Sequence, residues 1–187
     1  AGQKTPIWAS FAARKILLSR EKKKWAAASG SAVKTATTQQ KIMFLSYKNH
    51  VKGDSIYRIQ GIIEQLKPRE HSAPFVVLTT KLSDKKFEPD SGSNHYLYQF
   101  MNARINEAAE AKANELHRIW NSSAELLKQP KPYRYFSSHM NFLFSYEWMR
   151  VFLTYYFTFK SMIAEHNVKG VFLTATIGFF EKCCMFA

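Results

Sequence analysis

The feature that most constrains the fold is the apolar stretch 141–165, NFLFSYEWMRVFLTYYFTFKSMIAE. As one continuous helix it would be about 37 Å long, which exceeds the ~30 Å hydrocarbon core of a bilayer. Large apolar side chains cover most of its circumference, whereas a surface helix of a globular protein usually shows a narrower apolar stripe. The stretch therefore predicts a transmembrane helix. A long amphipathic helix in a soluble all-α protein is the alternative.

The polar residues of this stretch recur at steps of three or four, so they share one face of the predicted helix. Because helices in lipid associate through hydroxyl groups and close packing, this face predicts a seam that contacts a neighbouring transmembrane helix. The first two seam residues are also spaced to form an ion pair, which lowers the cost of carrying charge in a membrane. The seam consists of Glu147, Arg150, Thr154, Thr158 and Ser161.

The positive charge is concentrated in the N-terminal quarter of the chain. The whole sequence carries a net charge of +13, and residues 1–50 contribute ten basic residues against one acid. Thr5-Pro6 opens a basic amphipathic helix predicted to reach residue 28, with Trp8, Phe11, Ala12 and Ile16 on its apolar side. Such a segment favours anionic phospholipid such as cardiolipin, RNA phosphates or an acidic protein. The predicted contact residues are Arg14, Lys15, Lys22, Lys23 and Lys24.

We divide the chain into a basic extension (1–50), an extramembrane helical region (51–136) and a hydrophobic, membrane-associated region (137–187). In the middle region, a helix after Asp54 ends at Pro68, and a long amphipathic helix spans 95–128. Residues 73–82 have strand composition, but a lone strand has no sheet to join unless residues 41–47 pair with it. The pattern in 41–47 fits either a strand or a helix.

Two further segments flank the predicted transmembrane helix. Residues 129–136 mix basic and aromatic side chains, which is typical of a membrane interface; they include Lys131, Tyr133, Arg134 and Tyr135. After a turn at 166–170, residues 171–187 are apolar but contain only ten uncharged residues in a row. This end could form a second, short hydrophobic helix, lie in the interface or pack on a partner subunit.

No motif of catalysis or cofactor binding is recognisable. The two cysteines, Cys183 and Cys184, are adjacent, and no cysteine or histidine spacing fits zinc. The six histidines do not pair at helical spacing, and seven glycines are few for a nucleotide-binding enzyme. We therefore predict no catalytic residue, no metal site and no cofactor apart from bound phospholipid. No secretory signal is recognisable, and the initial Ala suggests a processed form. Loss of an organellar presequence is one explanation, which we favour, and removal of the initiator Met is another.

Together these features predict a mainly α, elongated protein with long amphipathic helices, one transmembrane helix and the short C-terminal hydrophobic helix as an option. The predicted function is that of a non-catalytic accessory subunit of a mitochondrial inner-membrane complex, either a respiratory complex or ATP synthase. Its partners would be other subunits and anionic phospholipid. The alternative is a mitochondrial ribosomal protein that binds rRNA through the basic N-terminal region, and a soluble helical enzyme is a third hypothesis.

Overall fold

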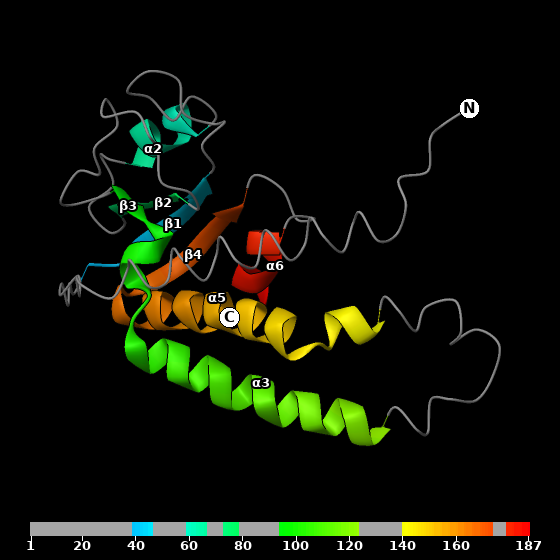
Figure 1. Ribbon diagram of the computed structural model, residues 1–187. Coiled ribbons are helices and arrows are strands. Elements are labelled where there is room, and N and C mark those ends of the chain that lie inside the picture. The colour runs from blue at the N-terminus through cyan, green and yellow to red at the C-terminus, as the bar shows by residue number, and fades with distance from the viewer. Residues whose placement is uncertain (1–38, 47–58, 67–72, 79–93, 124–139, 174–178) are drawn as a thin grey trace, which may run out of the picture. The chain divides into compact units, whose positions relative to one another are not determined.

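The computed structural model describes residues 39–46, 59–66, 73–78, 94–123, 140–173 and 179–187 (Figure 1). These residues fall into two compact units. A helical unit contains residues 103–123 and 140–154, and a sheet unit contains the other described residues. Helix α5 (Tyr146–Glu165) begins in the helical unit and ends in the sheet unit. The three regions expected from the sequence stay a prediction.

The sheet unit is built on four parallel strands in the order β3-β2-β1-β4. From the inner strand β1 the chain moves outward through β2 to β3, and it then returns to place β4 on the opposite side of β1. The direction of strand addition therefore reverses between β1 and β4. The strands are β1 (Lys41–Ser46), β2 (Ala73–Leu78), β3 (Asn94–Tyr96) and β4 (Val168–Leu173).

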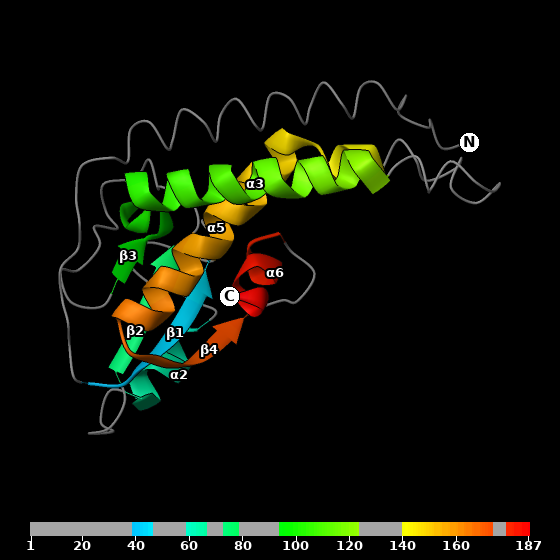
Figure 2. The ribbon, with the colours of Figure 1, turned by 90° about the horizontal axis from the view of Figure 1, so that it is seen from below.

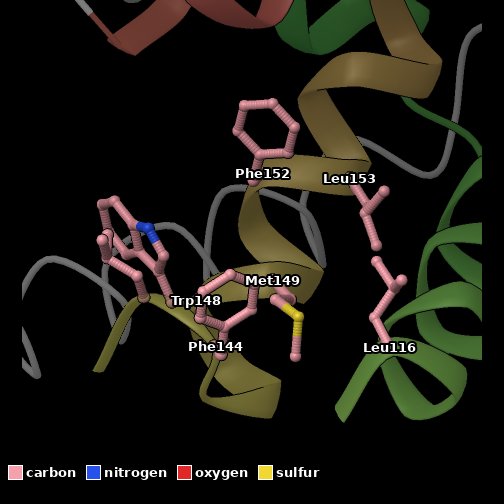
Figure 3. Close-up of a pocket in the computed structure, with 7 residues that line it drawn as sticks. Leu116, Phe144, Trp148, Met149, Phe152 and Leu153 are labelled. Atoms are coloured by element: carbon pink, nitrogen blue, oxygen red, sulfur yellow. The ribbon is translucent and has the colours of Figure 1, made fainter. Parts of the chain in front are cut away.

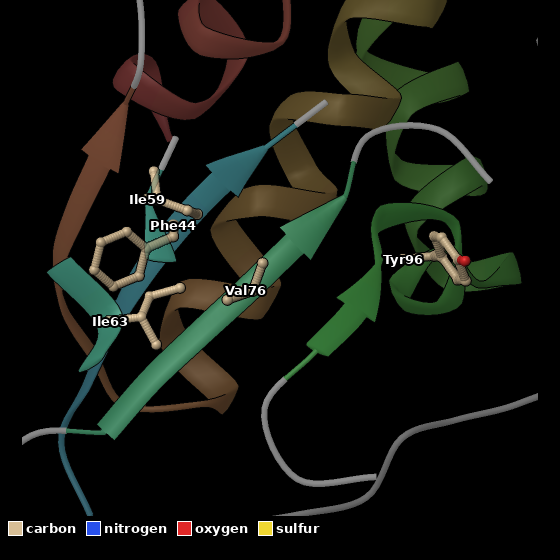
Figure 4. Packing of buried hydrophobic residues seen from close by; sticks show 5 residues of the cluster. All are labelled: Phe44, Ile59, Ile63, Val76 and Tyr96. Atoms are coloured by element: carbon tan, nitrogen blue, oxygen red, sulfur yellow. The ribbon is translucent and has the colours of Figure 1, made fainter. Parts of the chain in front are cut away.

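One face of the sheet packs against helix α2 (Gln60–Leu66). Strands β1 and β2 are nearly continuous apolar runs, as expected for parallel strands that are buried on both faces. Figure 4 shows Phe44 of β1 and Val76 of β2 facing Ile63 of α2, and Ile59 and Tyr96 complete this cluster. Full burial of each such side chain contributes about 1.5–3 kcal/mol, so this cluster holds α2 against the sheet.

The opposite face of the sheet is covered by the C-terminal half of α5 (Figure 2). Because side chains alternate across a strand, Met43 and Phe75 lie on this face, opposite Phe44 and Val76. Phe159 and Met162 of α5 are, like them, fully buried. Asn167 then turns the chain from α5 into β4 with a φ of 52°, a left-handed conformation that asparagine tolerates better than most residues. Its carbonyl accepts a hydrogen bond of 3.1 Å from the backbone N–H of Lys41 at the start of β1.

The helical unit pairs α3 (Ala103–Ser123) with residues 140–154. The alanine-rich stripe of α3 is buried at Ala109 and Ala113, and these small side chains allow a neighbouring helix to approach closely. Before α5, the chain is helical at 140–143 and then turns. The Ser145 hydroxyl accepts a 3.4 Å hydrogen bond from the backbone N–H of Trp148, as an N-cap residue does, and α5 starts at the next residue.

The predicted mainly α, elongated, membrane-anchored fold is wrong. The structure contains a four-stranded parallel sheet, and within its described residues no helix is long and apolar enough to cross a membrane. The stretch 141–165 is not one helix, because the turn at 144–145 interrupts it. Every 18-residue window of α5 also contains three charged side chains. Its wide apolar surface has another cause: a helix that is apolar on most sides can be buried inside a protein.

The sequence-based element boundaries also need correction. The helix expected over 95–128 begins only at Ala103, because residues 94–96 form β3 and residues 97–100 form the 3-10 helix η2 (Leu97–Phe100). The apolar C-terminal end divides into β4 and helix α6 (Phe179–Phe186). By contrast, the pairing on which strand 73–82 depended is confirmed, since Lys41 lies in register with Ala73.

Candidate functional site

The first candidate site lies at the carboxyl ends of β1 and β4, where the strand order reverses. In open α/β sheets, ligands bind in the crevice outside the carboxyl ends of the strands at such a reversal. Leu45 of β1 is in register with Leu173 of β4, so the two strands end side by side at this edge. Ser46, the last residue of β1, is fully buried there. The fold therefore places a candidate binding edge between these two strands.

Helix α6 follows this edge after five intervening residues. It lies beside the arrowhead of β4 in Figures 1 and 2. Two aromatic residues at its start, Phe179 and Phe180, pack edge-on against Tyr155 of α5, with ring centroids 5.7 and 4.9 Å apart. Tyr155 is itself buried. These contacts fix the first turn of α6 near the carboxyl edge of the sheet.

Glu181 lies in that first turn, and its side chain is buried, with only 2% of the residue exposed. Among the described residues, no group donates a hydrogen bond to its Oε2 atom. Burying a charged group without partners costs several kcal/mol, so such a group is retained where something compensates for it. A carboxylate accepts hydrogen bonds from hydroxyl, amide and ammonium groups. Glu181 is therefore suited to receive a donor from a ligand.

The two cysteines on α6 are not suited to nucleophilic chemistry. Both are buried and neither is part of a disulfide. Burial, followed by the neighbouring Cys184, raises the pKa of Cys183 to about 12. Burial, followed by the neighbouring Glu181 carboxylate, raises the pKa of Cys184 to about 12. Because the thiolate is the reactive form, these side chains act as apolar packing groups at neutral pH.

A second cluster of ionisable groups lies on the side of the sheet that faces α5. The centroids of the His95 and His166 imidazole rings are 6.4 Å apart. Each imidazole also packs against the rings of Phe75 and Phe100, with centroid distances of 4.9–5.5 Å. The Lys41 ammonium lies 5.0 Å from the centre of the Phe75 ring. Both histidines are less than 10% exposed, and within the part of the chain that the structure describes neither ring nitrogen of His166 has a hydrogen-bond partner. This arrangement is an aromatic core rather than an accessible site.

The pKa values in this cluster favour neutral imidazoles. Burial, then the nearby His166 and Lys41, lowers the pKa of His95 to about 4. Burial and Lys41 also lower the pKa of His166, and Glu165 opposes this shift in part. Neutral imidazole can bind metal, but in the part of the chain that the structure describes no three His, Cys, Asp or Glu side chains gather into a metal-binding group.

The helical unit contains an apolar pocket of about 300 Å³ (Figure 3). In that view Leu116 of α3 points toward Leu153 of α5, and the rings of Phe144, Trp148 and Phe152 lie on the other side. The described lining is wholly apolar, and it comprises Leu116, Leu143, Phe144, Trp148, Met149, Phe152 and Leu153. The pocket has no polar side chain in this lining that would orient a polar ligand.

The seam residues expected from the sequence occupy three kinds of surroundings. Glu147 is exposed in the first turn of α5, and Arg150 forms an ion pair of 3.4 Å with Glu110 of α3. Thr154 and Thr158 are fully buried, and the Thr154 hydroxyl donates to the Arg150 carbonyl at 2.8 Å. Ser161 donates to the Glu165 carboxylate. Their predicted contact with a neighbouring membrane helix stays a prediction.

The other residues predicted to make contacts lie outside the described residues. The predicted lipid or RNA contacts of Arg14, Lys15, Lys22, Lys23 and Lys24 stay predictions. The same holds for the predicted membrane-interface residues Lys131, Tyr133, Arg134 and Tyr135. Bound cardiolipin, partner subunits and a location in the mitochondrial inner membrane also stay predictions.

Sequence reasoning missed Glu181 and the two buried histidines. In the sequence, Glu181 is only a charge that interrupts the apolar stretch 171–187. The available signal was weak: an acid eight residues after a short apolar run, Val171 to Leu173. His95 and His166 are 71 positions apart, so no local sequence pattern could predict that their rings lie close together.

Comparison with known proteins adds no assignment. No family model matches the chain, and no curated protein or solved structure is significantly similar to it.

Proposed function

We propose that the sheet unit is a ligand-binding domain that holds a small, hydroxyl-bearing molecule, such as a sugar or a nucleoside, between the carboxyl ends of β1 and β4. The observation that carries this proposal is the order β3-β2-β1-β4, with its reversal beside β1. The same topology serves many unrelated chemistries, so it supports the place of binding and leaves the reaction open.

The chemical class of the ligand follows from Glu181. A buried carboxylate pairs well with hydroxyl groups, because they donate hydrogen bonds without bringing a charge that needs hydration. An anionic group would be repelled by the same carboxylate. The sequence also has only seven glycines and no recognisable phosphate-cradling loop. These features favour recognition through hydroxyl groups over recognition through phosphate.

The membrane-subunit function predicted from the sequence remains a separate hypothesis. Its main premise was the transmembrane helix 141–165, which the described residues do not provide. Its second premise, the strongly basic N-terminal quarter, lies outside the described residues. That the chain is not an enzyme likewise stays a prediction. Ligand binding at the sheet edge is the function that the described geometry supports best.

The test is a thermal-shift screen of the full chain with neutral sugars, nucleosides and nucleoside phosphates, followed by ligand-observed NMR on each hit. A ligand present at a hundred times its dissociation constant stabilises a protein by about 2.7 kcal/mol. For a chain of this size, that corresponds to a rise in melting temperature of roughly 5–10 °C. We expect a shift of this size with at least one hydroxyl-bearing compound.

The decisive comparison uses Glu181→Gln, with Glu64→Gln as the matched control. Glu64 is an exposed glutamate on α2 of the same unit, and its carboxylate accepts from Gln60. Glu181→Gln should leave the unliganded protein as stable as before or more stable, because it removes a buried charge. It should also weaken binding at least about tenfold, the effect of losing a charge-assisted hydrogen bond of ~1.4 kcal/mol or more. Equal binding by both variants, or no shift with any neutral compound, would contradict the proposal.

A further inference from the structure

We propose that the apolar pocket of the helical unit is the docking site of the chain's own N-terminal amphipathic segment, residues 5–28. This inference concerns the helical unit and does not depend on the proposed ligand site. It rests on the pocket's lining, on the polar groups around it, and on the pattern and charge of the segment.

The pocket has the size and the chemistry of a receptor for apolar side chains. Its volume of about 300 Å³ is at the lower end of the range seen for small-molecule sites. It therefore offers room for one or two large side chains. Leu143, one of its lining residues, is 42% exposed, so the pocket has an accessible rim. Ile119 of α3, outside the lining, is 53% exposed.

Polar groups near the pocket already have partners within the helical unit. The His117 Nδ1–H donates to the Phe144 carbonyl at 3.0 Å, and the Asn121 amide donates to His117 Nε2 at 3.1 Å. The Trp120 Nε1–H donates to Asn141 Oδ1 at 3.2 Å, and the Trp120 ring stacks on Phe144 at 4.3 Å. These groups hold the pocket wall in place. They leave apolar contact as the main means of recognition.

The N-terminal segment carries a matching set of side chains. Phe11 and Ala12 follow Trp8 by three and four positions, and Ile16 follows Ala12 by four, which places all four on one face of a helix. An amphipathic helix that lies in an apolar groove uses anchors at this spacing. A tryptophan and a phenylalanine one turn apart would supply the large apolar area that the pocket can bury.

Charge and tethering favour this occupant over a free partner. Residues 5–28 contain Arg14, Lys15, Arg20 and the run Lys22–Lys24 against one acid. Two acidic side chains, Glu115 and Glu147, adjoin the lining residues Leu116 and Trp148 in sequence, and both are at least partly exposed. Because the segment belongs to the same polypeptide, its binding is intramolecular and needs no free partner in solution.

The test is photo-crosslinking in the full chain, with p-benzoylphenylalanine replacing Leu143. The control places the same crosslinker at Ile119, which is exposed on α3 but does not line the pocket. A mixture of isotopically heavy and light chains separates contacts within one chain from contacts between copies. We expect mass spectrometry to map the crosslinks from position 143 to residues 5–28 of the same chain, and those from position 119 elsewhere.

A matched pair of substitutions in the segment sharpens the result. Phe11→Asp places a charge on the apolar stripe, and Ser10→Asp adds the same charge beside it. Phe11→Asp should reduce the crosslink yield from position 143 several-fold, whereas Ser10→Asp should preserve it. Neither lies in α3 or α5, so both variants should keep the fold of the helical unit, which circular dichroism during thermal unfolding checks. Crosslinks from position 143 to a second copy, to lipid or to another part of the same chain would overturn the proposal, as would equal yields from the two variants.

Discussion

Lowering the pH from 7.5 to 5 should destabilise the sheet unit through its buried histidines. In the folded chain the pKa of His95 is about 4, whereas an unfolded histidine titrates near 6.5. At a pH between these two pKa values the unfolded state binds more protons than the folded state, so the free energy of unfolding falls as the pH falls. The difference of about 2.5 pH units corresponds to roughly 3 kcal/mol at full titration, of which about 2 kcal/mol is lost by pH 5.

The structural cause of this loss is the aromatic cage around the rings. A proton on His95 would place a cation among Phe75, Phe100 and His166, with the Lys41 ammonium also nearby. His166 contributes in the same direction, because burial lowers its pKa as well. A loss of this size is a large part of the ~5–15 kcal/mol by which a typical domain is stable.

The assay is urea unfolding of the full chain at pH 7.5, 6 and 5, followed by circular dichroism. His95→Phe keeps a ring in the cage but cannot take up a proton, so its free energy of unfolding should fall by about 2 kcal/mol less than that of the unchanged protein between pH 7.5 and 5. Phe100→Leu is the control, since it loosens the same cage without removing a titrating group. It should lower stability by similar amounts at each pH. If His95→Phe kept the full pH dependence of the unchanged protein, the buried imidazole would not be its source.

Two further predictions concern the core and the cysteines. Phe44→Ala should lower the free energy of unfolding by about 3–5 kcal/mol in urea titrations, because it opens a cavity between α2 and the sheet, whereas Ile62→Ala on the exposed side of α2 should change it by about 0.5 kcal/mol or less. Cys183 and Cys184 should react with a thiol reagent at pH 8 only after denaturation, because burial raises both pKa values to about 12. Rapid labelling of the native chain would show that α6 does not bury them.

The sequence predicts individual elements of the sheet unit better than their assembly. Strand composition at 73–82 and the short apolar run at 41–47 both correspond to observed strands, and the helix that ends before Pro68 is α2. The other two strands give weak signals, since β3 has three residues and β4 contains Lys169 and Gly170. The sequence therefore indicates only two strands, which are too few to predict a sheet, and its longer helical segments favour a mainly α fold.

The prediction of a transmembrane helix over 141–165 failed because burial in a protein and burial in lipid select similar side chains. Phe159 and Met162 are apolar because they cover the sheet, and Thr158 is fully buried beside them in sequence. Composition alone cannot separate these two surroundings. The charged residues at positions 147, 150, 160 and 165 of α5 were the available counter-signal, since an uninterrupted apolar stretch is what a span requires.

The candidate ligand site depends on topology, which explains why no motif revealed it. Glu181 becomes a candidate only because β4 adds beside β1 and because α6 starts just after β4. A chain with the same strands in sequential order would have no reversal at this edge, and the same glutamate would then be an ordinary helix residue. The candidate site therefore depends on the strand order. Glu181→Gln tests whether this order creates a ligand-binding site, because it removes one charge at the edge while the sheet stays intact.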